Sequence, residues 1–135
     1  MNIDPKTGCF TLDDNSVIGP ALTRSKFLSS AAGKNSEVFV SNPPWCSFRL
    51  GDVGDFAFVT FFNGEKLESI QLSAILPGGS TSWDQWSQEE ENARKLANEK
   101  WLASAGLTSE KYPWGTVRSV YDSISCNSHI IIHYE

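Results

Sequence analysis

The stretch Phe56-Ala-Phe-Val-Thr-Phe-Phe62 decides the fold. It combines aromatic and β-branched residues and contains neither Gly nor Pro, which is typical of a buried strand. Asn63-Gly64 follows directly and is a dipeptide with a strong preference for hairpin turns. The return strand runs from Lys66 to Ile75, and its imperfect alternation leaves the register open. We therefore expect an antiparallel hairpin closed by a two-residue loop or by a bulged three-residue loop.

Further strand candidates lie on both sides of this hairpin, and turn residues separate them. Upstream and downstream, the expected strands are Cys9–Leu12 with Val17–Ile18, Glu37–Ser41, Trp45–Leu50, Gly115–Tyr121 and Ser128–Tyr134. Consecutive strands are close in sequence, so hairpins are expected to connect them. Such a chain predicts a mainly antiparallel sheet. The strand order within the sheet stays open.

A short helix is expected over about 24–32. Thr23 is a good N-cap residue, and Leu22 and Phe27 have the spacing of a hydrophobic staple. Gly33 is expected to end this helix.

The main helix is expected over about 87–105, where Ser87 and Glu90 form the pattern of a capping box and Gly106 is the stop signal. Its apolar face is expected to consist of Ala93, Leu96, Ala97 and Trp101. Ion pairs four residues apart are expected on the outer face, namely Glu90–Arg94, Glu91–Lys95 and Lys95–Glu99. These elements together predict an α+β domain over residues 1–135, with the main helix packed on one face of the sheet.

Composition limits the classes of function. The chain has 135 residues and a formal net charge of −5, which argues against binding to a nucleic-acid backbone. No apolar run approaches the roughly 20 residues of a membrane span, and the first residues lack the pattern of a signal peptide. The three cysteines are far apart and odd in number, so we expect no disulfide framework and a cytoplasmic location.

The sequence gives no signature of a catalytic, metal or cofactor site. His129 and His133 are expected on one strand, roughly 13 Å apart, which is too far to share one metal ion. Cys46 or Cys126 could pair with either histidine, but no local feature activates the thiol. Gly78-Gly79 lacks the lysine and the spacing of a phosphate-binding loop. We therefore expect no catalytic residue, no metal and no cofactor.

The best candidate site is a segment that combines tryptophan with acid. Its candidate partner-binding residues are Trp83, Asp84, Trp86, Glu89, Glu90 and Glu91. Aromatic side chains beside carboxylates are suited to anchoring a protein with a basic surface. The glutamates also have a structural interpretation, because the first turn of a helix favours negative charge. The question is whether Trp83 and Trp86 face solvent.

Three stretches together carry a family resemblance: Leu22-Thr-Arg-Ser-Lys-Phe-Leu28, Trp83-Asp-Gln-Trp-Ser87 with the glutamate-rich helix after it, and Tyr112-Pro-Trp-Gly-Thr-Val-Arg-Ser-Val-Tyr-Asp122. The chain resembles small, functionally uncharacterised bacterial proteins, some of which accompany toxin systems. The resemblance implies an antitoxin-like binding protein and identifies no catalytic residue.

Three hypotheses follow. The leading one is a non-enzymatic cytosolic protein-binding domain, an immunity-type protein that occludes a basic toxin domain, because acidic and basic partners associate quickly. The second is a small enzyme or ligand-binding protein with a pocket between helix and sheet. The third is a homo-oligomeric structural protein that pairs through Ser128–Tyr134 if that strand lies at an edge. We expect a monomer or a weak homodimer.

Overall fold

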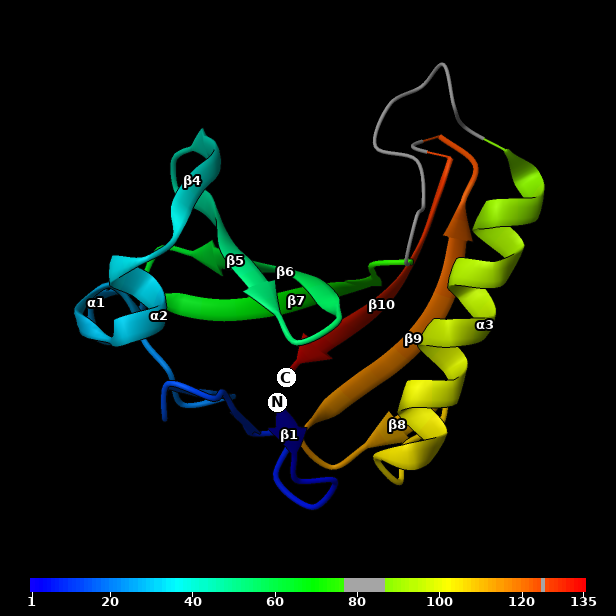
Figure 1. Cartoon of the computed structure of the whole chain (residues 1–135). Coiled ribbons are helices and arrows are strands. Elements are labelled where there is room, and N and C mark those ends of the chain that lie inside the picture. Colours follow the sequence, from blue (N-terminus) through cyan, green and yellow to red (C-terminus); the bar gives the residue numbers. More distant parts are fainter. Residues whose placement is uncertain (77–86, 125) are drawn as a thin grey trace.

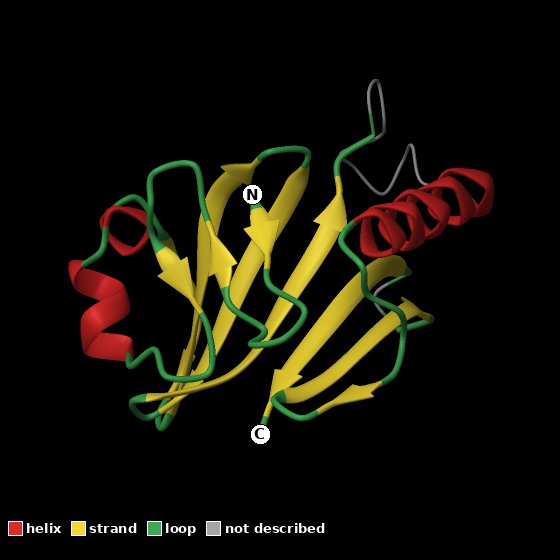
Figure 2. Ribbon diagram, turned by 90° about the horizontal axis from the view of Figure 1, so that it is seen from below, coloured by secondary structure: helices red, strands yellow, loops and turns green. Residues whose placement is uncertain are grey.

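The computed structural model describes residues 1–76, 87–124 and 126–135. Within these ranges the chain forms an α+β fold in which hairpins build two antiparallel sheets. The strands occupy the middle of the molecule, with two short helices beside one end of the large sheet and one long helix beside the other (Figures 1 and 2). The fold class expected from the sequence is confirmed.

The large sheet contains seven strands of the described chain, in the order β4-β5-β6-β7-β10-β9-β8. Their bounds are β4 Glu37–Asn42, β5 Trp45–Val53, β6 Phe56–Asn63, β7 Lys66–Ala74, β8 Lys111–Tyr112, β9 Gly115–Asp122 and β10 Asn127–Tyr134. The first four strands follow one another as hairpins, as expected. β10 lies between β7 and β9 and is not an edge strand, so the expected pairing of two chains through Ser128–Tyr134 is contradicted. Its apolar run Ile130-Ile131-Ile132 suits an interior position.

The central hairpin confirms the strand at Phe56 and resolves its register. Asn63 pairs with Lys66, so the two-residue loop consists of Gly64 and Glu65. Gly64 has a φ of +60°, the left-handed region that a tight hairpin turn requires. A register shift follows between Phe61 and Phe62. The turn therefore lies one residue later than Asn63-Gly64, and the irregularity lies in the strands.

A small sheet of the first residues packs beside the large one. It contains β1 (Asn2–Ile3), β2 (Phe10–Thr11) and β3 (Val17–Ile18) in that order. Phe10 pairs with Ile18, which confirms the expected first hairpin. β1 is too short to give a periodic signal and was not expected.

The short helix is divided in two, α1 (Arg24–Ser29) and α2 (Ala31–Lys34). Thr23 caps α1 as expected, because its side chain accepts from the Lys26 N–H at 3.2 Å. Ser30 is extended, and its hydroxyl caps α2 by accepting from Gly33. Gly33 therefore lies inside α2, and its expected role as a helix stop is wrong.

The main helix α3 (Gln88–Ser104) has the expected ends. The Ser87 hydroxyl accepts from the Glu90 N–H at 3.1 Å, and Gly106 follows the helix with a φ of +79°. Its expected apolar face is confirmed in part: Ala97 and Trp101 pack against the core, whereas Ala93 is exposed and Leu96 is 66% exposed. The side chains that α3 buries are Glu91, Asn98 and Leu102.

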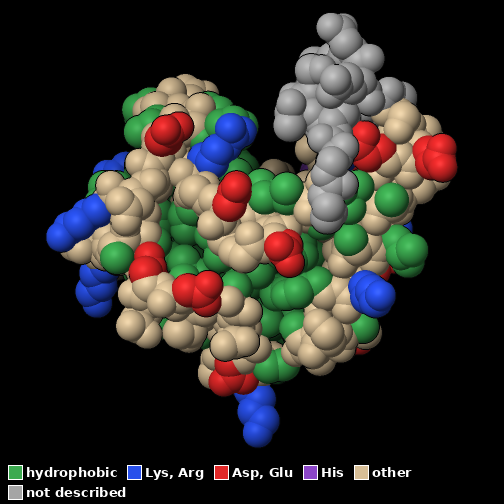
Figure 3. All heavy atoms as spheres, in the orientation of Figure 1, with side chains coloured by type: hydrophobic (Ala, Val, Ile, Leu, Met, Phe, Trp, Pro, Cys, Tyr) green, Lys and Arg blue, Asp and Glu red, His purple; other side chains and the backbone are tan. Residues whose placement is uncertain are grey.

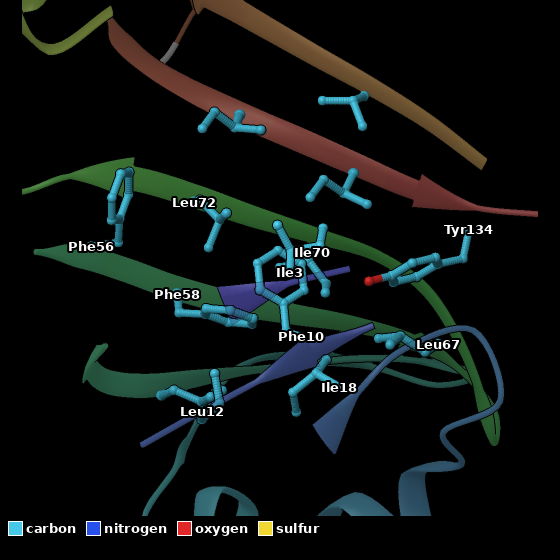
Figure 4. Close-up of a cluster of buried hydrophobic side chains, with 14 of the residues drawn as sticks. Ile3, Phe10, Leu12, Ile18, Phe56, Phe58, Leu67, Ile70, Leu72 and Tyr134 are labelled. Atoms are coloured by element: carbon cyan, nitrogen blue, oxygen red, sulfur yellow. The ribbon is translucent and has the colours of Figure 1, made fainter. Parts of the chain in front are cut away.

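One hydrophobic core joins both sheets and α3. Figure 4 shows side chains of the two sheets that belong to this core. Phe10 from the small sheet lies against Phe58 of β6, with ring centroids 5.5 Å apart. A hydrogen bond also connects residues near the two ends of the chain: the Tyr134 hydroxyl donates to the Gly8 carbonyl oxygen at 2.6 Å. Burial raises the pKa of Tyr134, so this phenol remains a hydrogen-bond donor.

Candidate functional site: the apolar hairpin surface

The expected site around the tryptophans divides into two parts. Trp83, Asp84 and Trp86 lie outside the described residues. Glu89 is exposed at the start of α3, and Glu90 forms an ion pair with Arg94 at 3.5 Å. The expected Lys95–Glu99 ion pair is present at 2.7 Å.

Glu91 is buried and contributes to the packing of α3 on the sheet. Its side chain is only 4% exposed, and its carboxylate pairs with Arg94 and accepts from the Ser128 N–H at 2.8 Å. The Ser128 hydroxyl donates back to the Glu91 carbonyl oxygen at 3.0 Å. In place of the expected pairing with Lys95, Glu91 thus holds α3 to the start of β10. Because it is buried, Glu91 does not belong to the surface that a partner could contact.

Two neighbours of Glu91 extend this buried polar contact to β7. Arg94 Nε donates to the Ala74 carbonyl oxygen at 3.0 Å, and the Ala74 N–H donates to Asn98 Oδ1 at 3.0 Å. The side-chain amide nitrogen of Asn98 is buried without a hydrogen-bond partner in the described part of the chain. Polar groups thus join α3 to the ends of two strands, beside its apolar contacts at Ala97, Trp101 and Leu102.

The histidines and cysteines do not form a catalytic pair with Cys46. β6 and β7 separate Cys46 on β5 from His129 on β10, which is roughly 14 Å along the sheet at about 4.8 Å per strand. Cys126 lies in the β9–β10 turn, where its thiol donates to the Ser123 carbonyl oxygen at 3.5 Å. Among the residues that the structure describes, no cluster of His, Cys, Asp or Glu could hold a metal ion.

His129 gives the fold a pH dependence. His129 is buried on β10, and burial lowers its pKa below the ordinary value of 6.5 although nearby Asp122 acts in the opposite direction. The unfolded chain therefore takes up a proton near pH 6.5 that the folded chain resists. It follows that the free energy of unfolding should decrease as pH falls below about 6.5.

We predict that His129→Gln reduces this acid sensitivity. Urea unfolding at pH 7.5 and pH 5.5 measures the loss for each protein, and the wild type should lose more free energy of unfolding than the variant. The comparison uses the change between the two pH values, so an equal destabilisation of the variant at both does not matter. Equal losses in the two proteins would contradict the role of His129.

The most exposed apolar segment of the described chain is the β4–β5 hairpin. All six residues of β4 are exposed, and Phe39 and Val40 retain 49% and 55% of their accessible surface. Trp45 at the start of β5 is 47% exposed. The hairpin projects at the top of Figure 1, and apolar side chains flank it in Figure 3. Monomeric proteins seldom expose apolar groups so close together without an interaction role.

Strand alternation puts four apolar side chains, from β4, β5 and β6, on one face of the sheet. Phe48 and Phe62 point into the core, so Trp45 on β5 and Phe61 on β6 point to the opposite face. Val40 pairs with Ser47 on that same face, and Phe39 lies there too, under the Arg49 guanidinium at 4.6 Å. We define the apolar hairpin surface as Phe39, Val40, Trp45 and Phe61. Val38 is exposed on the other face of the hairpin.

This surface contains a hollow that could receive an apolar side chain. The hollow has a volume of about 140 Å³ and is lined by Val40, Trp45, Cys46, Ser47 and Phe61. Ser47 holds its wall in place, because the Ser47 hydroxyl accepts from the Val40 N–H at 3.0 Å and donates to the Val40 carbonyl oxygen at 3.4 Å. A hollow with half-exposed aromatic walls is typical of the centre of a protein interface.

A second hollow lies at the other end of β5. Its volume is about 230 Å³, and its apolar floor includes Leu12 and Leu50. Three carboxylates line it, from Asp13, Asp14 and Asp52. Asp13 pairs with the N-terminal amine at 3.1 Å, and Asp14 accepts from the Ser16 N–H at 2.8 Å. Several acidic side chains are spread over the face that Figure 3 shows, in agreement with the negative charge of the chain.

Sequence reasoning missed the hairpin surface, although a signal was present. Val38-Phe39-Val40 is a run of three apolar residues, and Pro43-Pro44 precedes Trp45. A run without alternation indicates a strand buried on both faces or one left exposed on both, and the sequence does not distinguish the two. The strand order decides it, because β4 is the last strand of the sheet.

Comparison of the chain with protein-family models, with curated proteins and with solved structures gave no match. No helix within the described ranges is both long and apolar enough to cross a membrane. The fold and its surfaces therefore carry the functional interpretation.

Proposed function

We propose that this chain is a protein-binding domain that acts by non-covalent association. The observation that supports this proposal is the apolar hairpin surface, where Phe39, Val40 and Trp45 are each about half exposed around a hollow. Burying such side chains provides most of the binding energy in protein interfaces. Aromatic and β-branched groups at the end of a sheet form a ready contact surface.

The wider proposal is an immunity-type role, in which the domain occludes a basic toxin domain. A formal charge of −5 and the carboxylates around the second hollow suit a partner with a basic face. Glu89 belongs to the same acidic character, at the exposed start of α3. Attraction between opposite charges would speed association, and salt would weaken it.

We predict that Val40→Asp removes this chain from a larger complex. Tagged full-length protein in a native lysate should elute from a sizing column well above the mass of its 14.9 kDa chain. The variant should elute close to that mass, because a carboxylate replaces an apolar contact and would be buried without a partner.

Leu96→Asp is the matched control, since Leu96 is 66% exposed on α3. It changes an exposed apolar residue to the same acid and should leave the complex intact. Elution of the wild type at the mass of one free chain would overturn the proposal, and so would equal behaviour of the two variants.

A further inference from the structure

We infer that β4, the strand that carries Phe39 and Val40 of the apolar hairpin surface, pairs along its free edge, in antiparallel orientation, with the β4 of a second copy of this chain. This inference rests on the proposed function, because it names the partner of the same surface. The pairing would join the large sheets of two chains, each with seven strands in its described residues, into one continuous sheet across a twofold axis. The basic partner of the wider proposal would then bind elsewhere on the dimer.

Backbone groups along the free edge of β4 can form hydrogen bonds with another strand. β4 is the terminal strand of the described sheet, with β5 as its one strand neighbour. The Val40 N–H points toward β5, because it donates to the Ser47 hydroxyl. Alternation along an antiparallel strand therefore directs the Ser41 N–H toward the open edge. An edge of this kind is a template for another strand.

The composition of β4 fits a copy of itself. Its six residues, Glu-Val-Phe-Val-Ser-Asn, contain none of the lysines or prolines that block edge pairing. Glu37 is the one charged residue and lies at one end of the strand. Antiparallel pairing places the two copies of Glu37 at opposite ends, roughly 17 Å apart at about 3.4 Å per residue. The apolar residues of one copy then lie opposite those of the other, and no like charges face each other.

The available area predicts a weak dimer. Phe buries roughly 150–250 Å² when enclosed, so the half-exposed Phe39 on β4 offers on the order of 100 Å². With Val40 and the strand backbone, two copies bury less than the roughly 1,200 Å² at the lower end of specific, stable interfaces. Because each chain carries a charge of −5, repulsion opposes the pairing and salt should strengthen it. Association with a basic partner has the opposite salt dependence.

Sedimentation equilibrium of the purified full-length chain tests this inference. The wild type should reach about twice the 14.9 kDa chain mass at high protein concentration, and its dissociation constant should fall as salt is raised. Val40→Asp should raise the dissociation constant by at least about tenfold, because a carboxylate then lies opposite an apolar residue of the second copy in the new strand pair. Leu96→Asp should have no effect.

Ser41→Pro provides a second variant, since it removes an edge donor and leaves the apolar hairpin surface unchanged. It should also yield a monomer, and thermal unfolding verifies that each variant is folded. Amide NMR signals that move with protein concentration should come from β4.

A wild type that stays monomeric would overturn the dimer. If that monomer still enters a larger complex in lysate through Val40, protein binding stands and only the second copy is rejected. A dimer that Val40→Asp and Ser41→Pro both leave unchanged would place the interface elsewhere and also overturn the inference.

Discussion

Replacing Glu91 with Ala should remove about 3 kcal/mol from the free energy of unfolding, because it breaks a buried ion pair by deleting one partner. Glu91 is 4% exposed, and its carboxylate serves both Arg94 and the Ser128 N–H. Ser128 is itself buried, so its N–H would lose its partner without gaining water. Arg94 would keep Glu90 and the Ala74 carbonyl oxygen, which limits the loss to the lower end of the range for such pairs.

Urea unfolding followed by circular dichroism measures this loss. Glu89→Ala is the control, because Glu89 is an exposed glutamate in the same helical turn, and it should cost less than about 0.5 kcal/mol. Glu91→Gln keeps an acceptor for the Ser128 N–H and should fall between the two. A Glu91→Ala loss as small as that of Glu89→Ala would show that the buried pair does not stabilise the contact between α3 and the sheet.

This prediction changes how the acidic segment can be tested. Charge reversal at Glu91 would disturb folding as well as any interface, so loss of binding in such a variant would not identify a contact. Glu89 is the glutamate of this segment that is exposed and can report on a partner. The sequence does not separate the two, because both occur in one run at the start of a helix.

The inward face of α3 shows why apolar periodicity was insufficient. Of the predicted stripe Ala93, Leu96, Ala97 and Trp101, only Ala97 and Trp101 pack against the core. The residues that the helix buries fully are Glu91, Asn98 and Leu102. The reason lies in the sheet, where backbone groups of Ala74 and Ser128 require hydrogen-bond partners beneath the helix. Polar residues on α3 supply these partners. The backbone groups that require these partners belong to β7 and β10, which lie outside the helix sequence. A pattern within the helix therefore could not predict which of its polar residues are buried.

Local signals did predict the hairpins and most helix ends. Thr23, Ser87 and Gly106 act through hydrogen bonds or backbone angles within a few residues, and all three have the expected role. The pairing of β7 with β10 is different, because α3, β8 and β9 lie between them in sequence. Strand order, and with it the exposure of β4, follows from such long-range pairing.

The exposed β4 edge connects the fold to the proposed function. Within the described residues, β6, β7 and β10 pair along both edges, whereas β4 pairs along one edge and all six of its residues are exposed. Its apolar side chains would cost free energy in water, which is offset only when another surface covers them. A second copy pairs with the edge and packs beside Phe39 and Val40, whereas a different protein can cover the face itself, and the salt dependence of association distinguishes the two.

Phe10→Ala should remove about 3–5 kcal/mol from the free energy of unfolding, the range for truncating a fully buried Phe. Phe10 has no exposed surface and lies between three elements. Its ring meets Phe58 of β6 edge to face at 5.5 Å and stacks on Trp101 of α3 at 6.2 Å. The cavity left by Ala would therefore weaken the contacts among the small sheet, the large sheet and α3.

Thr11→Ala is the control, since the neighbouring Thr11 side chain is exposed on the same strand and should cost less than about 0.5 kcal/mol. Hydrogen exchange adds a second readout. If both sheets unfold as one unit, Phe10→Ala should reduce amide protection in β6 and β10 together with that in β2. Loss of protection restricted to β1, β2 and β3 would contradict this, because the first residues would then unfold separately from the large sheet.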